Sequence, residues 1–470
     1  MEYFILSLTL WILATYLTIW YCTKNQIISK SKFLLADRKL GFYESSFSIA
    51  ASWIWAPALF ISTQQAYLHG WVGLFWFCVP NFLCLILFAL LVNKIVDRFP
   101  EGYSLSEFMG ETYSLRVQSL YWISLIGLSI GAFATQVVAG AKFLEMTTRL
   151  NYTLSTFILV AIPLSYSLYF GLKSSVITDF AKILLLYAVG IIMIPMTLYY
   201  SGGVDSVLNG LNGINKNYTS LFDSNGWLIF ITFGLPTTIG LLSGPFGDQA
   251  FWQRAFSMDS AFRKKAFLLA SFLFIVVPLS MGLLGFAAAG VSYSAKSAQF
   301  VNLELVVNSL GTLGIVLFST IVLSSVTSIL DSKLCAVSSI AGHDIANRTN
   351  NSYNSLNISK ISMILLSILS LIIANIPNIQ LIYLFLIYGA LRASTLLPTI
   401  MTMFSDNPLP EKGVFYGILT SIFIGVPVFA YGLLNSIPII IVAGSLGGVL
   451  ISGAIIACFQ IIGKKICVDI

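Results

Sequence analysis

The charged side chains inside apolar stretches are the residues of this chain that could do chemistry. Asp179 lies just inside the stretch 175–200, and Arg392 lies in the segment IYGALRASTLLPTIM. A charge at membrane depth is costly unless it is paired or hydrated. Arg392 could hold an acidic substrate through two parallel hydrogen bonds, form a gate or pair with Asp331, or it could extend to the membrane surface. For Asp179 the structural alternative is a pair with Lys182, which lies on the same helical face.

Two long apolar spans are interrupted at matching places, near residues 50–60 (IAASWIWAPALF) and near residues 233–247 (FGLPTTIGLLSGPFG). An interrupted helix in a bilayer has backbone groups that lipid cannot satisfy, so it persists only where those groups line a cavity or hold an ion or solute. Pro57 alone is a weak signal, because Pro and Gly are common in membrane helices. The second span is more informative, since it contains Gly234, Pro236, Gly240, Gly244, Pro245 and Gly247. The paired interruptions predict a binding site between the two spans.

Polar and aromatic side chains near the interruptions are candidates for the wall of a solute cavity. Gln64 lies just past the first interruption, and Gln136 lies in the segment FATQVVAG. Trp53 and Phe233 belong to the two interrupted spans, although most aromatic residues in a chain with 14% aromatic content simply pack against neighbours. A cavity lined by aromatic groups and a few polar groups is typical of small-molecule sites. We therefore expect substrate contacts from Trp53, Gln64, Gln136, Phe233 and Arg392.

The elements that position these residues are predicted to be membrane-spanning helices. The chain has 470 residues, of which 57% are hydrophobic and only 9% are charged, whereas roughly a quarter of a soluble domain is charged. Apolar runs of about 20 residues, enough to cross roughly 30 Å of hydrocarbon, recur along nearly the whole chain. The composition predicts an all-α membrane protein with a single polytopic domain, 1–470.

Thirteen apolar runs are candidate spans. They lie near residues 3–22, 42–66, 73–96, 117–146, 152–171, 175–200, 227–250, 263–290, 307–340, 359–377, 380–402, 413–434 and 437–462. The loops on one side carry eighteen Lys and Arg residues, and those on the other carry only Arg149, Lys216 and Lys296. Basic loops face the cytoplasm. We therefore expect the N-terminus outside and the C-terminus in the cytoplasm, with the protein in the plasma or inner membrane.

The spans also predict an internal repeat. The blocks 42–200 and 227–402 each contain five spans, and the interrupted span is the first of each block. Because the blocks start on opposite sides, the second is inverted relative to the first, an arrangement that places the site at the midplane between them. The segment 1–41 then supplies an extra N-terminal span and loop, and the segment 413–470 supplies two C-terminal spans and a tail.

Composition argues against several classes of function. The six cysteines are scattered without metal-type spacing, and the two histidines, His69 and His343, are far apart. This pattern predicts no enzyme, no catalytic residues and no cofactor. We find no nucleotide-binding segment of the GxxxxGK type, and the net charge of +6 does not suggest nucleic acid.

Five segments resemble, in order, motifs of the sodium/solute symporter family. They are FLLADRKLGFYESSFSIAASW (33–53), SLSEFMGETYS (104–114), GLKSSVITDFAK (171–182), GDQAFWQRAFS (247–257) and SILDSKLCAVSSIAGHDI (328–345). The match covers roughly residues 33–402. The resemblance implies a leucine-transporter-like inverted repeat with discontinuous first and sixth core helices. It also implies inward movement of an organic solute with sodium.

The resemblance further implies a sodium site between the first and eighth core helices. Its ligands, carried over by position, are the carbonyls of Ala50, Trp53 and Ser325 and the hydroxyl of Ser328. Neutral oxygens freed by a helix break suit a hard cation without burying extra charge. The second hydroxyl position holds Ile329, which offers no oxygen, so the sodium site could be weakened, moved or lost.

Two more residues receive roles from the resemblance. Ser52 stands where relatives carry a polar substrate contact. Asp179 stands where the family has an acid on the inward route of the ion.

The leading expectation is sodium-coupled symport of a small polar organic solute by alternating access, with the solute, sodium and the lipid bilayer as partners. A proton-coupled carrier or an uncoupled facilitator of the same fold is the alternative that Ile329 favours. A membrane sensor derived from a transporter is an alternative of another class. The sequence does not indicate which solute is carried.

Overall fold

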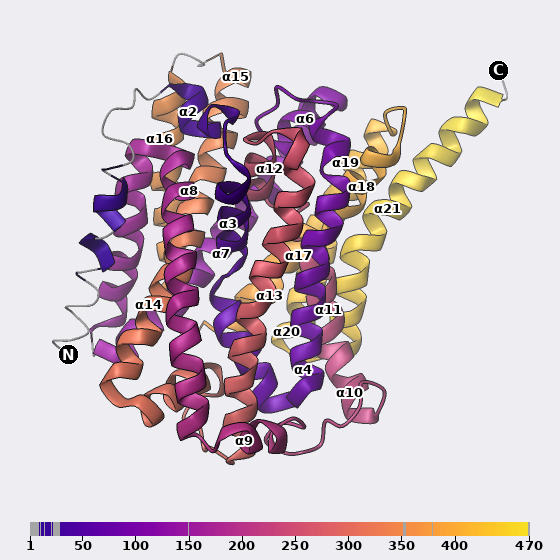
Figure 1. Ribbon diagram of the computed structural model, residues 1–470. Coiled ribbons are helices and arrows are strands. Elements are labelled where there is room, and N and C mark those ends of the chain that lie inside the picture. Colours follow the sequence, from indigo (N-terminus) through magenta and orange to yellow (C-terminus); the bar gives the residue numbers. More distant parts are fainter. Residues whose placement is uncertain are drawn as a thin grey trace.

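The computed structural model describes residues 9, 11–13, 15–19, 21, 29–148, 150–350, 354–377 and 379–468, with the backbone alone for 463–468. These residues form long helices that lie side by side (Figure 1). Eleven helical segments among them are long and apolar enough to cross a bilayer. The chain is therefore an all-helical integral membrane protein, as predicted. The count of thirteen spans is not confirmed, and the first expected span, 3–22, falls largely outside the described residues.

The long helices define the architecture, and short helices connect them at the two ends of the bundle. In chain order they are α2 (Lys30–Leu35), η1 (Ala36–Arg38), α3 (Phe42–Trp53), α4 (Ala56–Leu91), α5 (Asn93–Val96), α6 (Leu105–Thr112), α7 (Leu115–Thr148), α8 (Tyr152–Tyr200), α9 (Gly203–Asn209), α10 (Ser224–Ile229), η2 (Phe230–Gly234), α11 (Leu235–Leu242), α12 (Gln249–Phe256), α13 (Ser260–Gly290), η3 (Ala298–Phe300), α14 (Val301–Ser339), η4 (Ile340–Ile345), α15 (Ala346–Arg348), α16 (Ser355–Ala374), α17 (Leu381–Ala393), α18 (Leu396–Phe404), α19 (Glu411–Thr420), η6 (Ser421–Gly425), α20 (Val426–Leu434) and α21 (Pro438–Val468).

Glycines with positive φ bend the longest helices. Gly70 in α4 (φ 58°), Gly171 in α8 (φ 59°) and Gly311 in α14 (φ 58°) each interrupt the helical dihedral angles. At Gly70 an added Cβ would lie 2.2 Å from the Leu211 carbonyl oxygen, so only glycine fits there. The bend at Gly70 separates two spans that the sequence predicted as 42–66 and 73–96, although the helical segment Ala56–Val96 is continuous by hydrogen bonding.

The first predicted interruption is present between α3 and α4. The chain leaves the helical conformation at Ile54 (φ −81°, ψ 86°) and Trp55 (φ −112°, ψ 171°). Pro57 explains the break, because it has no N–H to donate to the carbonyl of Trp53 four residues earlier. The Trp53 carbonyl therefore lacks the partner that a continuous helix would supply.

The second predicted interruption is present between α11 and α12, over Ser243–Asp248. Two of its glycines allow close contacts with the rest of the site. A Cβ on Gly244 would lie 2.3 Å from Cη2 of Trp53, and a Cβ on Gly247 would lie 2.9 Å from Cβ of Arg392. The glycines of the second break thus make room for residues of the first break and of α17.

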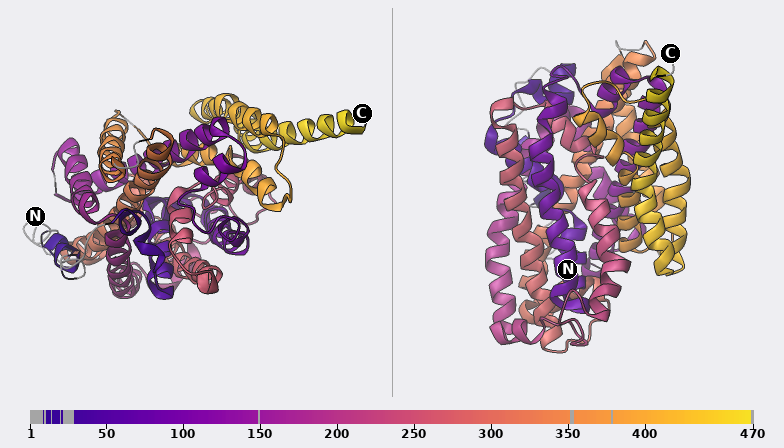
Figure 2. Two further views of the ribbon diagram at one scale, coloured as in Figure 1. Left: turned by 90° about the horizontal axis from the view of Figure 1, so that it is seen from above. Right: turned by 90° about the vertical axis from the view of Figure 1, so that its right-hand side faces the viewer.

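The two broken helices run in opposite directions. In Figure 1, α3 begins near the top of the bundle, whereas α10 and α11 lie in its lower part and α12 lies near the top. An isolated bridge between Leu40 and Met258 ties the segment before α3 to the segment after α12. Seen from above, the helical residues 15–19 and the helix α21 lie at opposite ends of an elongated outline (Figure 2). The inverted arrangement of the broken helices agrees with the prediction.

Candidate functional site between the broken helices

Side chains from two other helices satisfy the backbone groups that the first break frees. The side-chain oxygen of Gln136, on α7, accepts a hydrogen bond from the Ala56 N–H at 2.8 Å. The hydroxyl of Ser325, on α14, donates to the Ile54 carbonyl at 2.7 Å. The break is thus held by polar contacts, as a non-helical segment at membrane depth requires.

Two of the four residues predicted to bind sodium, Ser325 and Ser328, line a small crevice beside the first break. Its lining is Ala51, Ile54, Lys182, Ile183, Leu186, Ser324, Ser325 and Ser328, and it has room for about 10 Å³, roughly one water-sized sphere. The Ser328 hydroxyl is buried without a hydrogen-bond partner. The Ala50 carbonyl instead accepts from the Ile54 N–H at 2.8 Å. The structure therefore brings Ser325 and Ser328 together with the break, but it also places the Lys182 side chain at the same crevice.

Asp179 pairs with a residue that the sequence did not indicate. Its carboxylate lies 3.1 Å from Nη2 of Arg254, on α12, and both side chains are fully buried. The Ser48 hydroxyl, on α3, also donates to Asp179 at 2.6 Å. The local alternative, a pair with Lys182 on the same helix, is wrong, because Lys182 extends across to α14. Asp179 therefore links both broken helices to α8.

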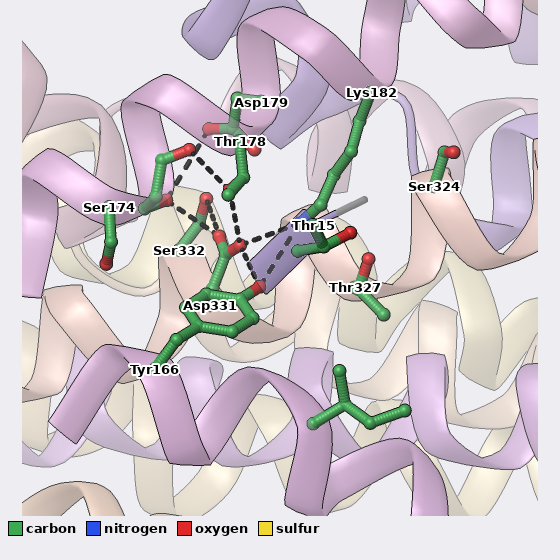
Figure 3. A network of polar contacts seen from close by, with 12 residues as sticks. Thr15, Tyr166, Ser174, Thr178, Asp179, Lys182, Ser324, Thr327, Asp331 and Ser332 are labelled. Atoms are coloured by element: carbon green, nitrogen blue, oxygen red, sulfur yellow. Dashed lines mark hydrogen bonds and ion pairs between the residues drawn. The ribbon is translucent and has the colours of Figure 1, made fainter. Parts of the chain in front are cut away.

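Lys182 forms a buried ion pair with Asp331, which lies in the C-terminal part of α14. The Lys182 ammonium is 2.9 Å from Oδ2 of Asp331 and 3.1 Å from the hydroxyl of Tyr166. Tyr166 and Ser175 donate to the same carboxylate at 2.6 and 2.7 Å. Figure 3 shows the Lys182 side chain reaching toward Asp331 and Tyr166, with Asp179 and Ser332 nearby. This polar network lies on the side of the first break that faces α8 and α14.

Arg392 is buried, with only 1% of its surface exposed, so it does not extend to the membrane surface. Its guanidinium carbon lies 5.6 Å from the ring centres of Trp53 and Trp55 and 5.5 Å from that of Tyr388. These distances fit cation–π contacts. Nε and Nη2 of Arg392 nevertheless have no hydrogen-bond partner among the residues that the structure describes. The proposed pair with Asp331 is absent, because that carboxylate already pairs with Lys182.

The charges around the two breaks do not balance. Four buried cations lie there, namely Lys182, Arg254, Lys333 and Arg392, with three buried carboxylates, Asp179, Asp248 and Asp331. Three ion pairs, Lys182 with Asp331, Arg254 with Asp179 and Lys333 with Asp248, use every carboxylate. Among these described residues, Arg392 is the cation left without a carboxylate. An unpaired buried charge is strongly unfavourable.

Further unpaired polar atoms lie around Arg392. The indole N–H of Trp55, the hydroxyl of Tyr388 and the side-chain amide nitrogen of Gln136 are buried without partners. Trp55 and Tyr388 are neighbours, with ring centres 5.9 Å apart, and Gln136 holds the backbone next to Trp55. Each of these atoms is a hydrogen-bond donor, or can act as one. Together with Arg392 they form a donor-rich group, which we call the Arg392 cluster: Trp55, Gln136, Tyr388 and Arg392.

The remaining predicted substrate residues lie outside the Arg392 cluster. Ser52 donates to the Ser48 carbonyl at 2.7 Å and shares a 3.0 Å hydrogen bond with Ser332, so it belongs to the polar network. Gln64 and Phe233 lie about ten residues from the breaks, on α4 and η2. Trp53 contacts the cluster, since it stacks on Trp55 with ring centres 5.0 Å apart.

The sequence reasoning missed Arg254, Lys333 and Tyr388 as members of the site. Lys333 carried a usable signal, because a lysine in the middle of an apolar span is rare and tends to be functional. Arg254 lies just past the predicted span 227–250, where the sequence predicts no further span before residue 263, but α12 is a buried helix in which Arg254 is fully covered. Tyr388 carried no signal, since aromatic residues are frequent throughout this chain.

Comparisons with known proteins agree on the family and the fold. Residues 33–421 match the Sodium:solute symporter family. The chain is 24% identical over 362 residues to the urea active transporter of Saccharomyces cerevisiae, which covers 71% of this chain and 48% of that protein. It is 25% identical over 309 residues to the sodium/pantothenate symporter of Haemophilus influenzae, and this alignment covers 64% of this chain and 62% of that protein. The chain spans about half the length of the urea transporters that it matches.

Two solved structures share the fold. One is a Na⁺-coupled sialic acid symporter in a substrate-bound outward-open state, with a TM-score of 0.78, 17% identity and coverage of 96% of both chains. The other is a nucleobase-cation-symport-1 family transporter in a closed conformation, with a TM-score of 0.59, 14% identity and coverage of 94% of this chain and 97% of that one. These similarities establish a transporter fold with two discontinuous helices.

Proposed function

The chain belongs to the sodium:solute symporter family, and from this premise we propose that it is a secondary active carrier for a small polar solute that bears a carboxylate. The solute is bound at the Arg392 cluster, between the two broken helices. Alternating access comes from movement of one helix bundle against the other around this site. The transport involves no chemistry on the solute.

The unpaired guanidinium of Arg392 is the observation that carries the proposal. A carboxylate accepts two parallel hydrogen bonds from Nε and Nη2 of an arginine, and these are the two atoms without partners. Binding an anion there would also restore the balance between four buried cations and three carboxylates. The donors on Trp55, Gln136 and Tyr388 suit further acceptor oxygens on the same solute.

The depth of the cluster supports a central binding site. Arg392 is the twelfth residue of the 24-residue segment Leu381–Phe404, which is long and apolar enough to cross a bilayer. It is therefore expected near the middle of an apolar core that is about 30 Å thick. A site at this depth is where an inverted-repeat carrier holds its solute.

The names of the relatives point to solutes of different charge. Several matched proteins are named urea transporters, and urea is neutral. Others are named for pantothenate and sialic acid, which both carry a carboxylate. Identity of 25% or less does not decide between them. The buried, unpaired Arg392 favours the acids.

For the coupling ion, family membership supports sodium, with the carbonyls of Ala50 and Trp53 and the residues Ser325 and Ser328 as proposed ligands. The unpartnered Ser328 hydroxyl also supports this site. Two features favour the alternative, a proton-coupled carrier or a facilitator. Ile329 provides no oxygen, and the Lys182 side chain lines the same crevice. Asp179 stays a proposed residue of the ion route.

Matched pairs of acids and their primary amides test the solute class directly. We expect small carboxylic acids to raise the midpoint of thermal unfolding of the purified protein in detergent, because ligand binding stabilises the folded state. The corresponding amides, which have almost the same shape but no charge, should have little effect. Uptake of the best acid into proteoliposomes then checks that binding leads to transport. Equal stabilisation by amides and urea, without an effect of the acids, would refute the carboxylate proposal.

A further inference from the structure

Lys182 is the one charged residue that lines the crevice next to Ser325 and Ser328. We propose that Lys182 is a tethered cation that takes the place of sodium at this crevice, so that this carrier binds and transports its solute without sodium. The inference deepens the function proposed above, because it concerns the ion requirement of the same carrier.

The ammonium group already has the oxygen contacts that a cation needs. It lies 2.9 Å from the Asp331 carboxylate and 3.1 Å from the Tyr166 hydroxyl. Only 4% of the Lys182 surface is exposed, and Asp331 is fully buried. Figure 3 shows these groups as one connected network with Asp179, Thr178 and Ser332. A lysine can donate three hydrogen bonds, and the Asp331 carboxylate and the Tyr166 hydroxyl accept two of them.

The charges near the crevice leave no attraction for a free sodium ion. Asp331 is neutralised by Lys182, and Asp179 is neutralised by Arg254 at 3.1 Å. A sodium ion in the crevice would lie against Lys182, whose ammonium group adds a second positive charge at low local dielectric, where repulsion is strong. Sodium would have to bind through neutral oxygens alone, against that repulsion.

Several of the neutral oxygens near the crevice already take part in a hydrogen bond. The Ser325 hydroxyl is already bound to the Ile54 carbonyl, and the Ala50 carbonyl is bound to the Ile54 N–H. Ile329 contributes none. The predicted ligands that remain are the Ser328 hydroxyl, which has no hydrogen-bond partner among the described residues, the Trp53 carbonyl at the break, and the Ser325 carbonyl, which lies within helix α14. The crevice is therefore a poor sodium site, and the chain places the cationic residue Lys182 next to it.

Removing the ammonium should create a sodium site. In Lys182→Ala, the Asp331 carboxylate would lose its cation but keep the hydroxyls of Tyr166 and Ser175. The shortened side chain would also enlarge the crevice next to Ser328. A buried carboxylate with neutral oxygens around it is a favourable ligand set for a hard monovalent cation. We expect Lys182→Ala to gain a response to sodium that the wild-type protein lacks.

Thermal unfolding of the purified protein in sodium chloride and in choline chloride at equal ionic strength tests this inference. The wild-type midpoint should be the same in both salts, whereas the Lys182→Ala midpoint should rise by several degrees in sodium only. Lys142→Ala is the matched control. Lys142, on α7, is half-buried and donates to the Ile379 carbonyl at 3.2 Å, so its removal should produce no response to sodium.

Two further variants test the ligands. Adding Asp331→Asn to Lys182→Ala should abolish the new sodium response, because the carboxylate is gone. Adding Ser328→Ala should raise the sodium concentration needed for half the shift. A folded Lys182→Ala protein with no response to sodium would overturn the inference.

The unfolding midpoints of the wild-type protein in sodium chloride and in choline chloride test the inference even if the variants do not fold. Stabilisation of the wild-type protein by sodium over choline, or uptake that stops in choline buffer, would overturn it. This readout needs no solute, and the acid and amide comparison needs no sodium. Failure of either proposal can therefore be recognised without the other.

Discussion

Arg392 and Arg254 are both buried arginines beside the breaks, yet their surroundings differ. Arg254 donates to Asp179, Ser48 and Ser332 at 2.8–3.1 Å, so its charge is balanced within the protein. Arg392 is held by aromatic rings and has no carboxylate partner. We interpret Arg254 as a structural residue that joins the broken helices, and Arg392 as a residue that binds the carboxylate of the solute.

Replacing each arginine by glutamine should therefore have opposite effects. Arg254→Gln leaves Asp179 buried and unpaired, and it should destabilise the protein by about 3–5 kcal/mol, the usual effect of breaking a buried ion pair. Arg392→Gln removes an unpaired charge, so stability without solute should be unchanged or higher. The same change should weaken binding of the acid by roughly 10–100-fold, because hydrogen bonds to charged groups contribute about 1.5–3 kcal/mol.

Chemical denaturation and acid titrations of both variants measure these effects. Strong destabilisation by Arg392→Gln in the absence of solute would show that Arg392 is structural after all. Unchanged acid binding by that variant would remove it from the site.

The sequence located the charged residues of the site better than it located their partners. Asp179 and Arg392 stand out because charges are rare in apolar spans. Their pairings depend on how separate helices pack, and Asp179 and Arg254 are 75 residues apart in the chain. The nearest candidate in sequence, Lys182, lies on the same helix but reaches across to Asp331 instead. Local spacing cannot distinguish these outcomes.

The two broken helices are the elements that create the site, and their glycines and prolines made them predictable. Pro57 ends α3 by removing one hydrogen bond, and Gly244 and Gly247 open the second break to close packing. Gly240 brings α11 against α17 at Gly389, where an added Cβ would lie 3.3 Å from Cα of Gly389. Small residues permit such close approach of membrane helices. The bend at Gly70 lies between the predicted spans 42–66 and 73–96, whereas the bend at Gly311, inside the predicted span 307–340, was not predicted, because a single glycine in an apolar run is common.

Gly244→Ala tests the close contact between the two breaks. The new methyl group would lie 2.3 Å from Cη2 of Trp53 and 2.7 Å from the Leu241 carbonyl, so the indole or the backbone must shift. We expect a loss of about 1–3 kcal/mol in stability, as for other overpacked sites, together with reduced uptake of the solute.

Gly190→Ala is the matched control for this change. Gly190 lies in α8, and the nearest atom to an added Cβ is 3.9 Å away. Alanine is about 1 kcal/mol better than glycine in a helix, so this variant should be as stable as the wild type or more so. Equal behaviour of the two alanine variants would argue against tight packing at the second break.

The segments that were predicted to be rich in Lys and Arg lie together at one end of the helix bundle. Figure 1 places α2, α6, α12 and α15 at one end of the molecule and α9 and α10 at the other, and the segments near the first group carry most of the Lys and Arg residues. The side that faces the cytoplasm, the plasma-membrane location and the boundaries of the two repeats stay predictions. Composition predicted the all-helical fold because helices satisfy their own backbone groups in lipid.

Near the two breaks, three buried ion pairs neutralise six charged residues, and the buried cation Arg392 has no carboxylate partner among the described residues. The three ion pairs join α8, α14 and α12 with its N-cap Asp248, and the Ser48 hydroxyl links α3 to them through Asp179. The unbalanced cation lies on α17, in contact with Trp53 and Trp55 of the first break. A solute that binds Arg392 would therefore lie next to the first break, and close to the second break at Gly247, where an added Cβ would lie 2.9 Å from Cβ of Arg392.

A structure determined with the most stabilising carboxylic acid bound is the most direct test. We predict that the carboxylate lies within hydrogen-bond distance of Nε and Nη2 of Arg392, between Trp53, Trp55 and Tyr388. A bound solute elsewhere in the molecule, with the guanidinium of Arg392 still unpaired, would contradict the proposed site.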